Sequence, residues 1–391
     1  MVLGIKGLYH LLVAIFSNIW FRFPARKLTV IGVTGTDGKT TTATLIYSIL
    51  KTAGYSASMI TSVHAVIGSK TYDTGFHVTT PGSFMLQKYL RSAVDSGDTH
   101  MVLEVTSHGL SQSRVWGIRF AVGVLTNVTH EHLDFHKTFS RYLLTKLSLL
   151  RRSAICVVNR DEAEVYNKII PKLRRKKIIT YALRRDAVIT PKTYRFSTKL
   201  SGIFNTYNCL AAIGVGYALG IGKKTMLHAI ASFTGISGRM ESIQDAPFRV
   251  IIDFAHTPNA IEQVLKTVRP ITKKRLIHVF GSAARRDIKK RAFMGNASAK
   301  YADLIVLTEE DYRNEDVGRI IDMIASGIPS GREVVRIPDR SEAIYYAVSH
   351  ARPGDTVIIT GKGHELSLAR GNREYPWSDQ AEARKILKKI S

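Results

Sequence analysis

The sequence is poor in cysteine and has no low-complexity stretch. Its two cysteines, Cys156 and Cys209, stand in apolar surroundings without CxxC spacing, so neither a disulfide framework nor a zinc cluster is indicated, and a reducing cytoplasm fits. No internal repeat or linker of biased composition interrupts the 391 residues. With 45% apolar and 22% charged residues, the chain has the composition of a globular protein and the length for two or three domains.

Acidic residues are also scarce, 31 against 56 basic residues, which gives a formal charge of +25. Such a surplus attracts anions, a class that includes nucleic acid, anionic lipid and phosphorylated small molecules. The basic runs, such as residues 174–177 and 273–275, are short and scattered, with no aromatic repeat resembling an RNA-binding motif. We therefore expect a solvated basic surface and no specific nucleic acid partner.

Residues 1–27 form an apolar N-terminal segment with a wide apolar face at helical spacing. Its uninterrupted apolar run is too short for a transmembrane span, and the bulky residues 20–23 stand where a signal peptide needs small ones. Two alternatives stay open: a helix packed on the body, or an interfacial helix that places a cytoplasmic protein at the inner face of the membrane. The basic residues that favour the second alternative are Arg22, Arg26 and Lys27.

Downstream, β-branched apolar runs alternate with helical patterns, which indicates parallel sheets built from βαβ units. The runs fall into two blocks, separated by a helical stretch at residues 205–219 and a turn-like segment near residue 236. The expected strands are residues 28–33, 101–105, 122–125 and 154–158 in the first block, and 250–254, 276–280, 304–307 and 357–360 in the second. The sequence predicts two α/β domains, at residues 28–236 and 237–391.

The first expected strand leads into a glycine-rich turn and then a helical pattern. Gly35 and Gly38 let backbone N–H groups approach phosphate oxygens, Lys39 supplies a point charge, and the Thr40 hydroxyl can join a magnesium ion. The pattern is GxxGK[ST] rather than the full GxxxxGK[ST], because Val33 occupies the place of the first glycine. Since strand and helix flank it as the motif requires, it predicts nucleotide phosphate binding by Gly35, Thr36, Asp37, Gly38, Lys39, Thr40 and Thr41.

Two further groups of polar residues can serve such a site. Glu104 lies at the end of the apolar run 101–105, where a parallel sheet presents its ligand edge, and is predicted to hold a metal ion or organise water. Residues 126–136 contain three histidines and two carboxylates, and Tyr142 and Lys146 follow. In isolation this loop is a zinc site or ordinary surface; beside a P-loop, its hard oxygen ligands suit magnesium better.

These motifs, in this order over residues 28–380, resemble the Mur ligases, and within them the branch that extends UDP-N-acetylmuramoyl-L-alanyl-D-glutamate. In the first block the matches are residues 34–40 with TGTNGKT (Asp37 for asparagine), 79–81 with TTP, 104–108 with EVSSH (Thr106 for serine) and 132–136 with DHLDYH, preceded by Glu131 for aspartate. Farther along the chain they are 204–208 with FNVYN, 238–241 with GRME, 253–258 with DYAHTP, 281–291 with GxGGxRDxxKR (Ala283 and Ala284 for glycines) and 361–365 with GKGHE.

The resemblance implies an ATP-dependent ligase of peptidoglycan biosynthesis, hence of cell-wall biogenesis, cell shape and cell division. Its fold would be a P-loop central ATPase domain with a mostly parallel sheet, plus a Rossmann-like C-terminal α/β domain. In the family reaction, the γ-phosphoryl group of ATP passes to a substrate carboxylate and an amine attacks the acyl phosphate. The resemblance assigns catalysis to Lys39, Glu104, His132 and Lys146, two Mg²⁺ ions to Thr40, Glu104, His132 and carbamylated Lys146, and further ATP contacts to Asn205, Arg239 and Asp253.

Two small-molecule subsites complete the implied site. The acceptor is assigned to Thr79, Thr80, Ser107, Gln112 and Arg114, and the amine donor to Arg286, Asp311, Arg313, Gly361 and Glu365. A diamino acid offers a carboxylate to arginine and a distal ammonium to an acid. Residues 310–313 keep the arginine of DNPR, the family signature for meso-diaminopimelate, but change its middle, so diaminopimelate is favoured over lysine. Arg313 as a surface ion-pair residue stays an alternative.

The family relatives begin with a domain that grips the UDP-sugar, whereas here 27 residues precede the P-loop strand, so we expect a chain without that domain. Folylpolyglutamate synthases resemble the two-domain remainder, which leaves open a ligase acting on a folate or an amino-acid polymer. A third hypothesis is a non-catalytic module that binds nucleotide and a membrane or anionic polymer. The joint presence of Lys39, Glu104, His132 and Lys146 speaks against it.

Overall fold

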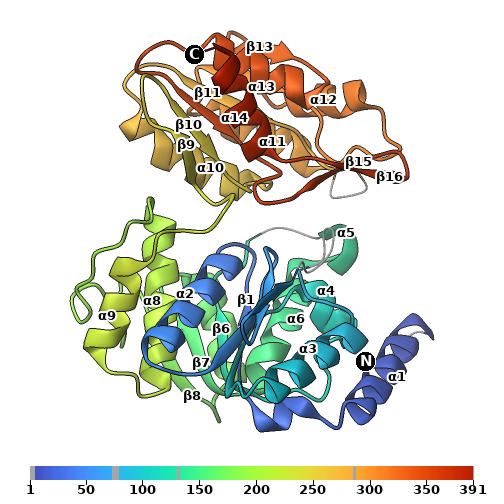
Figure 1. Ribbon diagram of the computed structural model, residues 1–391, viewed down its shortest axis with the longest axis vertical. Helices are drawn as coiled ribbons and strands as arrows, with labels where there is room; N and C mark the ends of the chain where they lie inside the picture. Colours follow the sequence, from blue (N-terminus) through green and yellow to red (C-terminus); the bar gives the residue numbers. More distant parts are fainter. Residues whose placement is uncertain (1–4, 73–78, 130–132, 285–287, 391) are drawn as a thin grey trace. The chain divides into compact units, whose positions relative to one another are not determined.

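The protein is represented by a computed structural model that describes residues 5–72, 79–129, 133–284 and 288–390. The chain divides into two compact units, Met1–Lys199 with Ile203–Thr234 and Leu200–Gly202 with Gly235–Ser391. Each unit is a sheet with helices packed against it (Figure 1). The expected α/β class with mostly parallel sheets is confirmed.

The first unit is built on an eight-stranded sheet in the order β4-β3-β2-β5-β1-β6-β7-β8. All neighbours from β2 to β8 pair parallel, and only β3 and β4 at one edge pair antiparallel. Its strands are β1 (Thr29–Thr34), β2 (Ala57–Ile60), β3 (Ala65–Ile67), β4 (Lys70–Tyr72), β5 (His100–Glu104), β6 (Phe120–Leu125), β7 (Ser153–Asn159) and β8 (Lys177–Tyr181). The sequence pattern predicted β1, β5, β6 and β7, whereas β2, β3, β4 and β8 are short and were not expected.

Helices cover both faces of this sheet (Figure 1). On one face lie α2 (Lys39–Thr52), α8 (Ile203–Ala218) and α9 (Lys223–Ser232), and on the other α3 (Ser83–Asp95), α4 (Ser107–Ser111) and α6 (Phe139–Arg151). The remaining helical segments are α5 (Leu133–His136), α7 (Ala163–Ile169) and η2 (Ile170–Lys172). Because both faces are covered, β1 buries apolar residues on both sides, including Val30, Ile31 and Val33.

The second unit contains a six-stranded sheet in the order β13-β12-β11-β14-β10-β9, with only β9 antiparallel. Its strands are β9 (Glu241–Gln244), β10 (Arg249–Ile252), β11 (Leu276–Phe280), β12 (Leu304–Leu307), β13 (Glu333–Arg336) and β14 (Thr356–Ile359), and a hairpin follows as β15 (Ser367–Arg370) and β16 (Arg373–Pro376). Helices α10 (Pro258–Val268), α11 (Lys290–Ala299) and α12 (Val317–Ala325) pack together, η3 (Arg269–Ile271) follows α10, and α13 (Arg340–Ser349) and α14 (Asp379–Ile390) share a core with the sheet.

The N-terminal segment forms α1 (Ile5–Trp20) and the short helix η1 (Pro24–Lys27), and α1 packs on α3. The packed helix, one of the two alternatives for this segment, is therefore present. Among the residues that the structure describes, no helix combines the length and apolar character needed to cross a bilayer.

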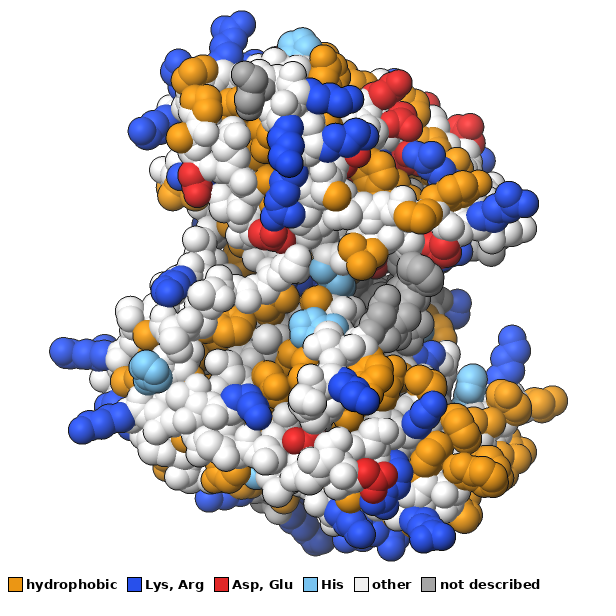
Figure 2. All heavy atoms as spheres, viewed as in Figure 1, with side chains coloured by type: hydrophobic (Ala, Val, Ile, Leu, Met, Phe, Trp, Pro, Cys, Tyr) orange, Lys and Arg blue, Asp and Glu red, His pale blue; other side chains and the backbone are white. Residues whose placement is uncertain are grey.

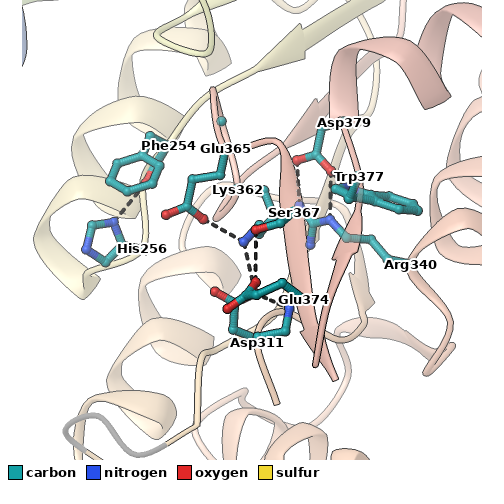
Figure 3. Close-up of polar contacts among 12 residues, drawn as sticks. Phe254, His256, Asp311, Arg340, Lys362, Glu365, Ser367, Glu374, Trp377 and Asp379 are labelled. Carbon is teal, nitrogen blue, oxygen red and sulfur yellow. Dashed lines mark hydrogen bonds and ion pairs between the residues drawn. The ribbon is translucent and has the colours of Figure 1, made fainter. Parts of the chain in front are cut away.

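A buried ion pair joins α13 to α14 in the second unit (Figure 3). Arg340 donates to both carboxylate oxygens of Asp379, at 2.8 and 2.7 Å, and both side chains are fully buried. The same guanidinium donates to the carbonyls of Glu309 at 3.1 Å and Thr360 at 2.9 Å. It therefore ties the ends of β12 and β14 to these two helices.

Replacing Asp379 with alanine is expected to lower the free energy of unfolding of the second unit by about 3–5 kcal/mol, because it leaves the Arg340 charge buried without its partner. Denaturant unfolding followed by circular dichroism measures this. Asp245→Ala is the matched control, since the Asp245 side chain pairs at the surface with Arg249 at 3.3 Å, and should cost no more than about 1 kcal/mol. Equal losses for the two variants would contradict the buried-pair argument.

Candidate functional site

Four adjacent strands of the first sheet, β2, β5, β1 and β6, end at one edge, where the residues after β1 and the last residue of β5 were predicted to bind ligand. β1 leads through residues 35–38 into α2, and β5 ends at Glu104. Val33 lies beside Glu104 in the parallel register, so the glycine-rich turn and the Glu104 carboxylate meet. The carboxyl edge of a parallel sheet is where open α/β proteins bind ligands.

The turn before α2 needs both of its glycines. A Cβ atom on Gly35 would lie 1.8 Å from the Thr126 hydroxyl, and one on Gly38, whose φ is 77°, would lie 2.3 Å from Oδ1 of Asn208. Asn127, which follows the neighbouring strand β6, stabilises the turn. Its backbone carbonyl accepts from the Thr36 N–H and its Oδ1 from the Asp37 N–H, at 2.9 Å each. The turn thus presents the N-terminus of α2, whose first N–H groups have no intrahelical acceptors and suit a phosphate.

Glu104 is buried at the centre of a hydrogen-bonded chain. Its Oε2 accepts from the Thr40 hydroxyl at 2.9 Å and from the Ser62 N–H at 2.9 Å. The Ser62 hydroxyl lies 3.0 Å from Oε1 and 3.0 Å from the Thr79 hydroxyl. Sequence reasoning missed Ser62, because the four-residue strand β2 that places it was not expected.

The donor set of this chain fits magnesium. Thr40 and Glu104 offer a hydroxyl and a carboxylate side by side, the hard oxygen ligands that Mg²⁺ prefers. In the part of the chain that the structure describes, no three side chains of His, Cys, Asp or Glu come together as a metal site. The two remaining predicted metal ligands are His132 and Lys146. Of these, His132 lies outside the described residues.

Lys146 and Tyr142 reach the P-loop from α6. The Lys146 side chain is almost fully buried, its ammonium donates to the Gly35 carbonyl, and Nζ lies 4.4 Å from the centre of the Tyr142 ring. The Tyr142 hydroxyl is 3.1 Å from that of Thr36. Lys146 therefore lies at the glycine-rich turn and not on the surface.

Of two further predicted nucleotide residues, Lys39 lies at this turn, and Asn205 is linked to it through Asn208. The Lys39 ammonium donates to the Thr36 carbonyl at 2.6 Å. Asn205 accepts from the Asn208 amide at 3.0 Å, and Asn208 in turn accepts from the Thr42 hydroxyl of α2 at 3.2 Å. Asn208 therefore links α8 to α2. The sequence motif at residues 204–208 includes this residue but did not predict a role for it.

The predicted acceptor residues adjoin Glu104. The Thr80 hydroxyl donates to the Glu104 carbonyl at 3.1 Å, and the Arg114 guanidinium donates to the Thr80 carbonyl and, through Nε at 3.0 Å, to the Gln112 side chain. Ser107, buried, is the first residue of α4. The structure therefore brings these residues and Thr79 together in the first unit.

In the second unit, Arg239 and Asp253 lie close together. The Asp253 carboxylate accepts from the N–H groups of Met240 at 2.8 Å and Ala255 at 2.7 Å. Burial raises the pKa of this carboxyl, while the Arg239 charge and the two N–H donors act in the opposite direction. The Arg239 guanidinium lies 4.2 Å above the Phe254 ring, a cation–π contact that fixes its position.

Lys362 bridges two of the predicted donor-binding acids (Figure 3). Its buried ammonium lies 2.9 Å from Oδ1 of Asp311 and 2.6 Å from Oε2 of Glu365. Burial favours the neutral amine, but the charges of Glu365 and Asp311 outweigh it and raise the pKa of Lys362. Sequence reasoning assigned no role to this lysine, although it is the second residue of the unbroken GKGHE segment.

The other residues predicted to bind the donor differ in their surroundings. Gly361 directly precedes Lys362 in the chain, whereas Arg313 forms a half-exposed ion pair with Glu374 at 3.4 Å. The Arg313 backbone has a φ of 49° and is held by the Ala369 carbonyl, which accepts its N–H at 3.0 Å. Arg286 lies outside the described residues.

Comparison with known proteins matches both halves of the chain. Residues 33–216 match the Mur ligase middle domain, and residues 238–363 match the Mur ligase, glutamate ligase domain. The UDP-N-acetylmuramoyl-L-alanyl-D-glutamate–2,6-diaminopimelate ligase of Aquifex aeolicus is 38% identical over 389 residues, 95% of this chain and 80% of that protein. The UDP-N-acetylmuramyl-tripeptide synthetase of a Roseiflexus species is 36% identical over 412 residues, 95% of this chain and 81% of that protein.

Solved structures agree in fold. A UDP-N-acetylmuramoyl-L-alanyl-D-glutamate–2,6-diaminopimelate ligase superposes with a TM-score of 0.64 at 28% identity, covering 95% of this chain and 82% of that one. The folylpolyglutamate synthase of Mycobacterium tuberculosis superposes with a TM-score of 0.73 over 90% of this chain and 92% of its own, but at 17% identity it shows the fold alone. With two domain families matched and relatives at 36–38% identity along nearly its whole length, the chain belongs to the Mur ligase family of ATP-dependent ligases.

Proposed function

We propose that this ligase joins a diamino acid, with meso-diaminopimelate favoured, to the carboxylate of a muropeptide-type acceptor through an acyl phosphate. One observation carries the proposal: a hydrogen-bonded path runs from Thr40 through Glu104 and Ser62 to Thr79. It joins the phosphate-binding turn directly to the segment assigned to the acceptor. Phosphoryl transfer to an acceptor carboxylate needs these two groups side by side.

In this proposal the turn at residues 35–41 holds the ATP phosphates, and Lys39 lies against the charge that develops in transfer. Thr40 and Glu104 would hold one magnesium ion, and carbamylated Lys146 with His132 a second. Bound magnesium neutralises phosphate charge and orients the phosphates. Contacts to the adenine, a phosphate and the ribose are assigned to Asn205, Arg239 and Asp253, respectively.

Two sets of residues would bind the other substrates. The acceptor is assigned to Thr79, Thr80, Ser107, Gln112 and Arg114. The donor is assigned to Arg286, Asp311, Arg313, Gly361 and Glu365. Lys362 leaves the cluster with Asp311 and Glu365 one net negative charge, which suits a distal ammonium. All substrates in this scheme are small molecules of the cytoplasm, and we further propose that residues 1–27 associate with the inner face of the membrane.

The proposed reaction is tested by a ligation screen on the full chain. ATP and UDP-muramoyl dipeptide are incubated with meso-diaminopimelate, lysine or other amines, and a parallel arm offers folate with glutamate. The expected result is a product of the mass of dipeptide plus diaminopimelate, with phosphate release that needs both acceptor and amine. Product only in the folate arm would identify the folylpolyglutamate-type alternative. ATP binding without turnover in any arm would contradict a ligase and favour the non-catalytic module.

Replacing Lys146 with alanine should lower turnover at least roughly 100-fold, because a carbamate that holds a metal ion at the phosphates would be lost. Short carboxylates such as acetate should restore part of the rate by occupying the vacated space. Lys168→Ala, which removes an exposed lysine paired with Glu164, is the matched control and should keep full turnover. Loss of turnover without any rescue, in a variant that unfolds like wild type, would argue against the carbamate.

Arg313→Ala should raise the KM for the diamino acid by roughly 10- to 100-fold with little change in kcat, since a charge-assisted contact to the donor carboxylate is lost. Arg313→Lys should recover only part of this affinity because it lacks the guanidinium fork. Arg319→Ala, on the exposed side of α12, serves as control. An unchanged KM in Arg313→Ala would leave this residue as a partner of Glu374 alone.

A further inference from the structure

Helix α1 turns its small and polar residues toward the body of the first unit. Its buried residues are Ala14, Ser17 and Asn18. The Asn18 amide donates to the carbonyls of Ala14 at 2.8 Å and of Trp116 at 3.0 Å. A buried amide bonded in this way fixes the rotation of the helix about its own axis.

The large apolar residues of α1 consequently face outward. They recur every three or four positions on the side opposite Asn18, and each is at least 50% exposed: Ile5, Leu8, Tyr9, Leu12, Phe16, Ile19 and Trp20. We name this set the α1 apolar face; in Figure 2 apolar side chains form a cluster at the lower right of the molecule. A helix of a globular protein normally buries such a stripe, so an exposed one marks an interaction surface.

The apolar surface continues onto the neighbouring helix. Phe84 and Met85, in the first turn of α3, are also exposed. The Phe84 ring lies 5.0 Å from that of Phe21, directly after α1. The exposed area therefore spans two packed elements and has a fixed shape.

Charge along the segment that carries this surface is mainly positive, although the exposed Asp95 at the end of α3 lies near Lys27. The first acidic residue of the chain is Asp37, so no carboxylate lies in or directly after α1. The exposed basic residues of this segment are Lys6, Arg22, Arg26 and Lys27, and Lys88 is exposed on α3. An apolar stripe flanked by a surplus of cations is complementary to anionic lipid. A second copy of the chain would bring like charges together instead.

We infer that the α1 apolar face inserts into the surface of an anionic bilayer, with the helix lying parallel to the membrane. At about 1.5 Å per residue, 16 residues are too short for an apolar layer of about 30 Å. Tyr9 and Trp20 carry rings with polar groups that suit the headgroup region. This binding does not depend on the ligase reaction.

The test is co-sedimentation of the full chain with vesicles of phosphatidylcholine containing about one third phosphatidylglycerol. Wild type should bind these vesicles, bind pure phosphatidylcholine less, and at roughly 0.5 M salt bind the anionic vesicles no better than the neutral ones. Phe16→Glu with Trp20→Glu should weaken binding at least about tenfold. Phe293→Glu is the matched control, because Phe293 is 65% exposed on α11 and Trp20 is 64% exposed; it should bind as wild type.

Two further variants separate the contributions. Arg22→Gln with Arg26→Gln and Lys27→Gln should weaken binding to the anionic vesicles while leaving binding to neutral vesicles unchanged. Trp20→Phe, which keeps the apolar face and so should fold normally, should abolish a blue shift of tryptophan emission on vesicle addition. Absence of wild-type binding, or equal loss in Phe293→Glu, would overturn the inference. The inference would also be overturned if the wild-type chain bound no vesicles but formed a dimer that the Phe16/Trp20 double variant does not form.

Discussion

The Glu104 carboxylate is the constraint around which the first unit is organised. A buried carboxylate is costly unless donors or a cation compensate it. The strand order puts such donors within reach, because β1 and β2 flank β5 and deliver Thr40 and Ser62 to its carboxyl end. The same geometry places the glycine-rich turn next to the segment proposed to bind the acceptor, so charge compensation and the proposed substrate alignment share one set of contacts.

Buried charges in the second unit are also compensated by hydrogen-bonded partners. Arg340 is satisfied by Asp379 and two carbonyls, and Lys362 by Asp311 and Glu365. Both cations lie beside the carboxyl ends of β12 and β14, where Asp311 and Gly361 follow the strands. Removing one partner from such a buried set leaves an uncompensated charge, so the network should hold the proposed donor loops in one arrangement.

Helix α1 packs against the segments proposed to bind the acceptor, and its apolar face lies on the opposite side of the helix. Asn18 bonds to the Trp116 carbonyl, two residues after Arg114, and α3 begins two residues after Pro81. A membrane bound by α1 would therefore lie near these segments.

Sequence alone determined the features that depend on local pattern. Long apolar runs predicted β1, β5, β6 and β7, and a glycine-rich turn between strand and helix indicated the proposed phosphate site, because both signals act within a few residues. The strands β3 and β4 have three residues each, too few for a periodic signal. Strand β2 has a serine within its four residues and no continuous apolar run, and so Ser62 was missed. Only tertiary structure could show that Lys362 bridges Asp311 and Glu365, and that α1 turns its apolar side outward. Both depend on contacts between segments far apart in the chain, and the amphipathic pattern of a helix does not say which side meets the protein.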